Sequence, residues 1–325
     1  YNQSCLRGLR FVREVGPFCF WRCDMIKRVI SFVLAAVLLS PVFTSCGQED
    51  FSGTVIKEKI RSECAFITDV SSGDTVYISG EADTVVYPAS TTKLLTSLAA
   101  LLCLPADTTI TPGDEVYLPE AGSSFAYIRP NHTLTLEMLI EGMLLPSGND
   151  AAYATAAACG YSLAGEEVGY IEAVDEFVRY MNDYAESLGC TSTNFTTPDG
   201  YADEEHYSTL GDMALISRAA YDNEIIRKYA AMPEDNVIYA SGHTNTWVNT
   251  NKFLDMSSKY YNKYVNGLKT GSLTGNYSLI VSYDDGAREC IIGVFGGRDD
   301  TSRYKDAADL IKLYTKYLSR ANSSD

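Results

Sequence analysis

Apolar residues alternate in short runs toward both ends of the folded part of the chain and recur at helical spacing in its middle. A period of two indicates a strand with one buried face, and a period near 3.6 indicates a helix with a buried stripe. The short runs predict strands at 64–70, 75–79, 264–270, 277–283 and 289–295. The helical runs predict helices at 87–104, 136–145, 150–159, 171–188, 209–220 and 303–318.

The order of these elements predicts one α+β domain over residues 56–320. Strands from both ends of this domain form an antiparallel sheet with flanking helices, and the helices between them form an inserted helical subdomain. The turn signals at 71–74 and 284–287 predict hairpins within the sheet. Residues 105–135 are loop-rich, with short strand candidates only.

A different pattern precedes this domain. Residues 1–24 contain no methionine and show no clear period, so we interpret them as upstream read-through that is not structured. From Met25 a basic pair, an apolar run and small residues follow in the order of an export signal, which we assign to residues 25–46. The apolar run is too short for a comfortable membrane span. Residues 47–55 are predicted to be a linker.

The end of this signal, Val-Phe-Thr-Ser-Cys-Gly at 42–47, resembles the lipobox of bacterial lipoproteins, with Phe43 where leucine is usual. The resemblance implies that Cys46 is lipidated and becomes the mature N-terminus. Acyl chains there would tether the exported protein to the outer face of a membrane without spanning it. Cleavage by an ordinary signal peptidase is the alternative.

The composition of the chain excludes some classes of partner and of metal site. The formal net charge is −16, which argues against nucleic acid or an anionic membrane surface as a partner. The three histidines are scattered and form no zinc-peptidase pair, so we expect no metal site. Five cysteines within the predicted domain are widely spaced, form no C-x-x-C pair, and are expected to be small buried hydrophobes, with room for one disulfide: Cys64, Cys103, Cys159, Cys190 and Cys290.

Ser90 and Lys93 stand at the start of an apolar helix over 87–104 and project from one face. A serine hydroxyl becomes a good nucleophile when a base takes its proton, and a lysine is such a base when burial or a neighbouring cation lowers its pKa. The same Ser-x-x-Lys spacing recurs at Ser302 and Lys305. That second copy opens a polar, charge-rich helix, and we interpret it as a solvated helix start.

Two further segments are candidate partners for Ser90. Ser147-Gly148-Asn149 follows a proline between two predicted helices, where it is either a turn with Asn149 as the helix cap or a hydroxyl and an amide held on a rigid corner. Lys269-Thr270-Gly271 ends a predicted strand, followed by Ser272. It is either a plain strand-end turn or a carboxylate-binding site, with Gly271 allowing a ligand close to the backbone.

The three segments together resemble the serine penicillin-recognising enzymes, whose signature is S-x-x-K, S-x-N and K-T-G. The S-G-N form is similar to the low-molecular-weight penicillin-binding proteins, the D-alanyl-D-alanine carboxypeptidases of the S11 family. This implies a β-lactamase-like transpeptidase fold. One departure is Asp199, where the family usually has histidine before glycine; we take that position as structural.

The resemblance also implies roles. Ser90 would attack the penultimate D-Ala of a peptidoglycan stem peptide and release the terminal D-Ala, with Lys93 as base and penicillin as a covalent inhibitor. Ser147 would relay a proton to the leaving amine. The remaining roles are substrate binding by Asn149, Lys269, Thr270 and Gly271, and an oxyanion hole of the Ser90 and Ser272 backbone N–H groups.

Two other functions remain open. A β-lactamase would share the fold, but the class A enzymes use an additional glutamate base, for which the segment between Asn149 and Lys269 offers no convincing counterpart. A non-catalytic sensor of β-lactams or wall fragments would acylate and stay acylated. Endopeptidase activity on cross-links is a variant of the main hypothesis.

Overall fold

The computed structural model describes residues 60–165, 167–201 and 203–321. The assignments made above for residues 1–24, 25–46 and 47–55, including lipidation at Cys46, lie outside the described residues. Among the helices of the described part, none is long and apolar enough to cross a membrane.

A five-stranded antiparallel sheet is built from both ends of the described chain, as predicted, in the order β2-β1-β11-β10-β9. β1 pairs with β11, so that Cys64 lies opposite Phe295, while β9, β10 and β11 follow one another as a meander. The strands are β1 (Cys64–Asp69), β2 (Thr75–Ser79), β9 (Val265–Leu273), β10 (Asn276–Asp284) and β11 (Glu289–Gly297).

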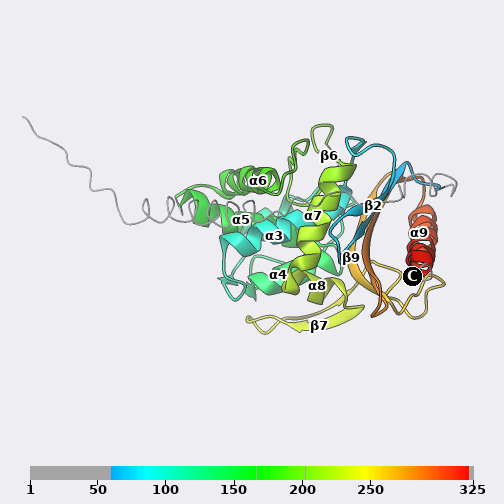
Figure 1. Ribbon diagram of the computed structural model, residues 1–325. Helices are drawn as coiled ribbons and strands as arrows, with labels where there is room; N and C mark the ends of the chain where they lie inside the picture. The colour runs from blue at the N-terminus through cyan, green and yellow to red at the C-terminus, as the bar shows by residue number, and fades with distance from the viewer. Residues whose placement is uncertain (1–59, 166, 202, 322–325) are drawn as a thin grey trace, which may run out of the picture. The chain divides into compact units, whose positions relative to one another are not determined.

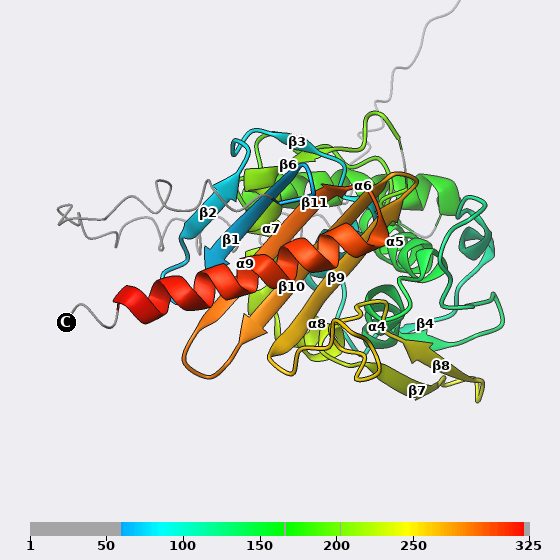
Figure 2. The ribbon, with the colours of Figure 1, turned by 90° about the vertical axis from the view of Figure 1, so that its right-hand side faces the viewer.

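One long helix, α9 (Asp300–Ala321), lies across one face of this sheet over β9, β10 and β11 (Figure 2). Its apolar side buries Tyr304, Leu310 and Tyr314 against sheet residues such as Ile67 and Ile292. The opposite face of the sheet is covered by the helical part of the chain (Figure 1). The sheet is therefore buried on both sides, which explains why all six residues of β1 are buried.

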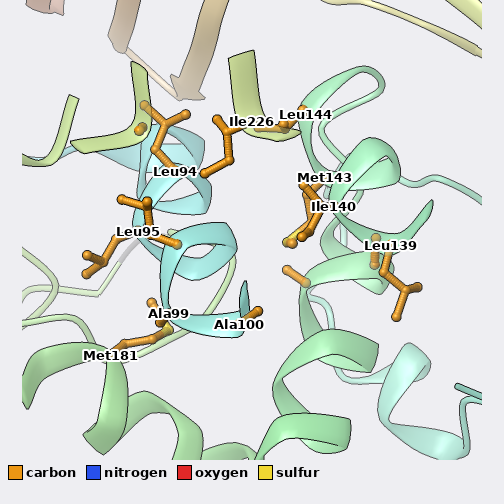
Figure 3. Close-up of a cluster of buried hydrophobic side chains, with 14 of the residues drawn as sticks. Leu94, Leu95, Ala99, Ala100, Leu139, Ile140, Met143, Leu144, Met181 and Ile226 are labelled. Carbon is orange, nitrogen blue, oxygen red and sulfur yellow. The ribbon is translucent and has the colours of Figure 1, made fainter. Parts of the chain in front are cut away.

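The helical part is organised around α3 (Lys93–Cys103), which is buried on most sides as its leucine-rich sequence predicts. Leu94 and Leu95 point from α3 toward different neighbours, and Ile140 and Met143 approach from α4 (Figure 3). The surrounding helices are α4 (Leu136–Leu144), α5 (Asn149–Ala164), α6 (Tyr170–Ser187), α7 (Leu210–Asp222) and α8 (Glu224–Ala230). α3 is held by this core, so its first turn has a fixed position beside the sheet.

Several short elements complete the fold. Most of them were not predicted, among them helix α8 and a hairpin of β7 (Glu234–Ile238) with β8 (Thr244–Val248). The short pairs β3 (Val85–Val86) with β6 (Ser208–Thr209) and β4 (Thr109–Ile110) with β5 (Leu134–Thr135) fasten loops. Two 3-10 turns, η1 (Ala89–Thr92) and η2 (Asp114–Tyr117), are also present. The five cysteines of the described part are free thiols, so the single disulfide allowed by the sequence does not form.

Candidate active site

Ser90 and Lys93 lie together at the junction of η1 and α3. Ser90 belongs to the 3-10 turn and Lys93 is the first residue of α3, so Ser90 precedes the α-helix by one turn instead of opening it. Lys93 Nζ donates to Ser90 Oγ at 2.9 Å. Ala89, immediately before Ser90, has φ of 52°, a backbone conformation that is strained for a residue with a Cβ. The turn therefore holds the hydroxyl against the amine at some local cost.

The amine of Lys93 has two further acceptors. Its Nζ donates to Asn149 Oδ1 at 2.7 Å and to the Asp199 carbonyl at 2.8 Å. Burial lowers the pKa of Lys93 to about 8, against the raising effect of the Asp199 and Asp150 charges. When the amine is neutral it keeps two N–H groups for these acceptors, and its lone pair then faces Ser90. This arrangement favours removal of the Ser90 proton.

The loop between α4 and α5 supplies the second group of predicted site residues, Ser147 and Asn149. Ser147 has φ of 62° and accepts a hydrogen bond from Lys269 Nζ at 2.8 Å. The prediction of Asn149 as a helix cap is wrong, because Gly148 occupies the cap position and Asn149 is the first helical residue. Instead of capping, the Asn149 side chain accepts from Lys93 and donates to Ser123 Oγ at 2.9 Å.

Lys269 is almost fully buried in β9, an edge strand of the sheet. Burial lowers its pKa well below the ordinary lysine value, and the charges of Lys93 and Arg303 lower it further. The prediction that the Lys-Thr-Gly segment ends its strand is wrong. β9 continues to Leu273, because residues after Gly271 pair with β10 across a tight turn.

Thr270 and Gly271 lie on β9 where this strand passes the η1 turn that carries Ser90. Thr270 Oγ1 is 2.6 Å from Thr250 Oγ1. A Cβ placed on Gly271 would lie 2.6 Å from the Pro88 carbonyl oxygen. The strand backbone therefore needs glycine here to pass the turn that carries Ser90, whereas the sequence suggested close approach by a ligand.

Ser90 of the first segment and Asn149 of the second line one cleft of about 690 Å³, and the strand after the third segment lines it from Ser272 onward. Lys93, Ser147 and the 269–271 segment lie behind these residues and are not part of the lining. Ser90 and Ser272, whose N–H groups we predict to form the oxyanion hole, both line the cleft. Its other walls come from the 121–124 loop, the loop after α6, and the turn between β9 and β10, with lining side chains that include Tyr87, Ser123, Asn149, His206, Asn276 and Tyr277.

A comparison with protein families agrees with this geometry. Residues 52–299 match the model of the D-alanyl-D-alanine carboxypeptidases, peptidase family S11. The chain belongs to this family.

Curated relatives and solved structures give the same result. The chain is 29% identical over 283 residues to the D-alanyl-D-alanine carboxypeptidase DacF of Bacillus subtilis, covering 85% of this chain and 68% of that protein. It is 30% identical to DacC of Escherichia coli, covering 79% of this chain and 62% of that protein. The structure of the Streptomyces K15 DD-transpeptidase superposes with a TM-score of 0.71 at 27% identity, covering 80% of this chain and 99% of that one. The predicted penicillin-binding-protein-like fold is confirmed.

The second Ser-x-x-Lys copy does not form a comparable pair in this S11 family member. Ser302 Oγ donates to the Asp299 carbonyl at 2.7 Å, and Lys305 is exposed. The interpretation of this helix start as solvated is wrong, however, because Ser302 and Arg303 are both buried against the sheet.

Arg303 is the main site-adjacent residue that the sequence did not indicate. Its guanidinium donates to the carbonyls of Gly271 at 2.5 Å and Ser278 at 2.9 Å and to Ser272 Oγ at 3.1 Å. It therefore ties α9 to the strand that carries Lys269. Ser123, which lines the cleft and accepts from Asn149, was also missed. Neither Arg303 nor Ser123 shares a motif with Ser90, and only tertiary contacts bring them near the site.

Proposed function

We propose that this protein is a serine-type D-Ala-D-Ala carboxypeptidase that acts through an acyl-enzyme on Ser90. The observation that carries the proposal is the bridge made by the buried amine of Lys93 between Ser90 Oγ and Asn149 Oδ1, at the edge of one cleft. A nucleophile beside a base, with the base oriented by further groups, is the arrangement that acyl transfer requires.

The first half-reaction follows from these contacts. Neutral Lys93 takes the Ser90 proton while Ser90 Oγ bonds to the carbonyl carbon of the penultimate D-Ala. When the C–N bond breaks, the leaving amine needs a proton. Ser147 is suited to relay it, since its oxygen already accepts from Lys269 and its own O–H is left to donate. The products are free D-Ala and the Ser90 ester.

Water completes the cycle by attacking the ester, which returns the shortened stem peptide and the Ser90 hydroxyl. The backbone N–H groups of Ser90 and Ser272 would stabilise the oxyanion in both steps, at about 3 kcal/mol for a donor of this kind. Lys269 and Thr270 would bind the terminal carboxylate, and Asn149 would contact the substrate amide. No step calls for a metal or an organic cofactor.

The substrate places the enzyme outside the cytoplasm, in the cell envelope, where peptidoglycan is found. Lipidation at Cys46 would keep it at the membrane surface, whereas simple cleavage of the 25–46 signal would release it. Mass spectrometry of the mature N-terminus distinguishes the two. A Cys46→Ala protein that still carried the lipid would contradict the assignment of the anchor.

The direct test of activity is release of D-Ala from a synthetic pentapeptide ending in D-Ala-D-Ala. Wild type should release one equivalent per peptide, and Ser90→Ala should lose activity by at least a thousandfold while keeping its melting temperature. Ser302→Ala is the matched control, being a serine at the same spacing from a lysine, and should retain wild-type activity. Loss of activity in the Ser302 variant alone would contradict the assignment.

Turnover of benzylpenicillin separates the carboxypeptidase from its alternatives. A long-lived adduct together with D-Ala release supports the proposal. Fast penicillin hydrolysis without D-Ala release would identify a β-lactamase, and a permanent adduct without D-Ala release would identify a sensor.

A further inference from the structure

The segment 197–201 is fastened to the start of α3. Thr96 Oγ1 donates to the Pro198 carbonyl at 2.7 Å, and Lys93 Nζ donates to the Asp199 carbonyl. A Cβ on Gly200 would lie only 2.0 Å from the Ala89 carbonyl oxygen, so the two backbones are in direct contact. These contacts hold Asp199 in one position relative to Lys93.

The carboxylate of Asp199 is buried with an incomplete set of hydrogen bonds. Its residue is 1% exposed, and Oδ1 accepts from the Tyr201 N–H at 3.0 Å. Oδ2 is buried and has no hydrogen-bond partner among the described residues. A buried carboxylate with an unpartnered oxygen destabilises the folded state unless a cation lies nearby. The nearby cation is the ammonium of Lys93.

Asp150, the other buried carboxylate near Lys93, differs in this respect. Its oxygens accept from the backbone N–H groups of Ala126, Ile128 and Ala151. Asp150 is thus stabilised by three backbone donors, whereas Asp199 has one, the N–H of Tyr201. Asp199 also raises the pKa of Lys93 more than Asp150 does.

Other titratable groups also interact with this pair. Lys269 on β9 and His206 on the same loop face Lys93, and Tyr153 on α5 faces Asp199. Burial lowers the pKa of His206 to about 4 and raises that of Tyr153 above the ordinary tyrosine value, so both are neutral near pH 8. Burial also lowers the pKa of Lys269 well below the ordinary lysine value. Asp199 is thus the principal negative charge that acts on Lys93.

We propose that Asp199 is a positioning residue for the Ser90 reaction: its buried carboxylate stabilises the ammonium form of Lys93 and so sets the pH above which Lys93 can take the Ser90 proton. This inference rests on the function proposed above. It gives a chemical role to a position that the sequence resemblance led us to treat as structural. The ammonium must first release one proton to solvent, and a nearby carboxylate opposes that release.

The test is the pH profile of acylation by a fluorescent penicillin, measured from pH 6 to 10 in wild type and Asp199→Asn. The amide oxygen of asparagine can still accept from Tyr201, so the substitution removes the charge and retains the loop contact. The acidic limb of the second-order rate constant should move to lower pH by on the order of half a unit or more. At pH 6.5 the variant should then react about threefold faster than wild type, with a similar plateau at high pH.

Two further variants sharpen the test. Glu205→Gln removes an exposed charge from the same loop and should leave the limb in place. If Asp199→Asn does not fold, Asp199→His takes its place, since imidazole is neutral near pH 8 and should move the limb in the same direction. A limb that stays at the wild-type position, or moves to higher pH, overturns the inference. Failure of the wild type itself to be acylated would instead overturn the proposed function.

Discussion

At the scale of single residues, Lys93 is fully buried, yet its amine keeps three hydrogen-bond acceptors within the protein. Burial makes the charged form costly, while three acceptors and two nearby carboxylates support it. The balance lowers the pKa to about 8, within reach of neutral pH. An amine with this pKa changes from an acid to a base over the range in which the enzyme would work.

This balance predicts the pH dependence of Ser90 acylation. The reactive form is the neutral amine, so the rate constant should rise through a limb near pH 8 and level off above it. Between pH 7 and pH 9 the increase should be about tenfold, because the neutral fraction grows by that factor. Stopped-flow acylation with a fluorescent penicillin measures the profile. A flat profile, or a limb near the ordinary lysine value of 10.5, would show that Lys93 is not the base.

The residues that carry motifs could be predicted from the sequence, and the residues that support them could not. Ser90, Lys93 and Lys269 were singled out because their types and order are specific. Arg303 was not, since its guanidinium reaches β9 only because α9 crosses the sheet there. Contacts between elements far apart in the chain leave no local pattern to find.

At the scale of elements, the turn η1 is held between two backbones. Segment 197–201 touches it at Ala89, and β9 passes it at Pro88, with a glycine at each contact. The turn therefore cannot shift without moving either the loop or the edge strand. This explains how strained backbone at Ala89 is maintained.

The loop contact predicts the effect of Gly200→Ala. Its Cβ would overlap the Ala89 carbonyl, so the Ser90 turn or the loop must move, and acylation should slow by at least tenfold. Gly242→Ala is a matched control, because Gly242 has the same φ of 81° and nothing within 4 Å of the added Cβ. Both variants should lose roughly 1 kcal/mol of stability from the backbone conformation. Equal acylation rates in the two variants would contradict this account of the turn.

The long, strongly patterned elements were predicted, although α3 begins at Lys93 and not at 87, and α5 runs to Ala164 and not to 159. Short elements were missed for a physical reason. Helix α8 has seven residues, too few for a period to emerge. β7 begins with Glu-Asp-Asn, residues that are rare in strands, and pairs with β8 through tertiary support. The hydrophobic periodicity was enough to predict the layers of helices and sheet. The short elements α8, β7 and β8 form only through contacts with the rest of the fold.

At the scale of the whole molecule, stability should depend on another buried carboxyl, Glu141 of α4. It is 2% exposed, and burial first, then the neighbouring Asp235, raise its pKa to about 8 from an ordinary value of 4.5. The folded state therefore holds a proton that the unfolded state releases. The stabilisation is complete below about pH 4.5 and is lost as pH rises toward about 8.

Glu141→Gln tests this dependence. The difference in melting temperature between wild type and variant should shift in favour of the variant from pH 6 to pH 8 and then stay constant. Glu186→Gln, an exposed charge on α6, should show no such trend. Parallel curves for wild type and Glu141→Gln would contradict the assignment of a protonated Glu141. Scanning calorimetry at intervals of half a pH unit measures both.

The central claim is that segments far apart in the sequence converge on Ser90 to make it the acylated nucleophile. Mass spectrometry of the protein after brief exposure to benzylpenicillin tests it most directly, with peptide mapping to locate the adduct. We predict one penicilloyl group per molecule, on the peptide that contains Ser90, and none in Ser90→Ala. An adduct on another serine, or no adduct in a folded wild-type protein, would contradict the account.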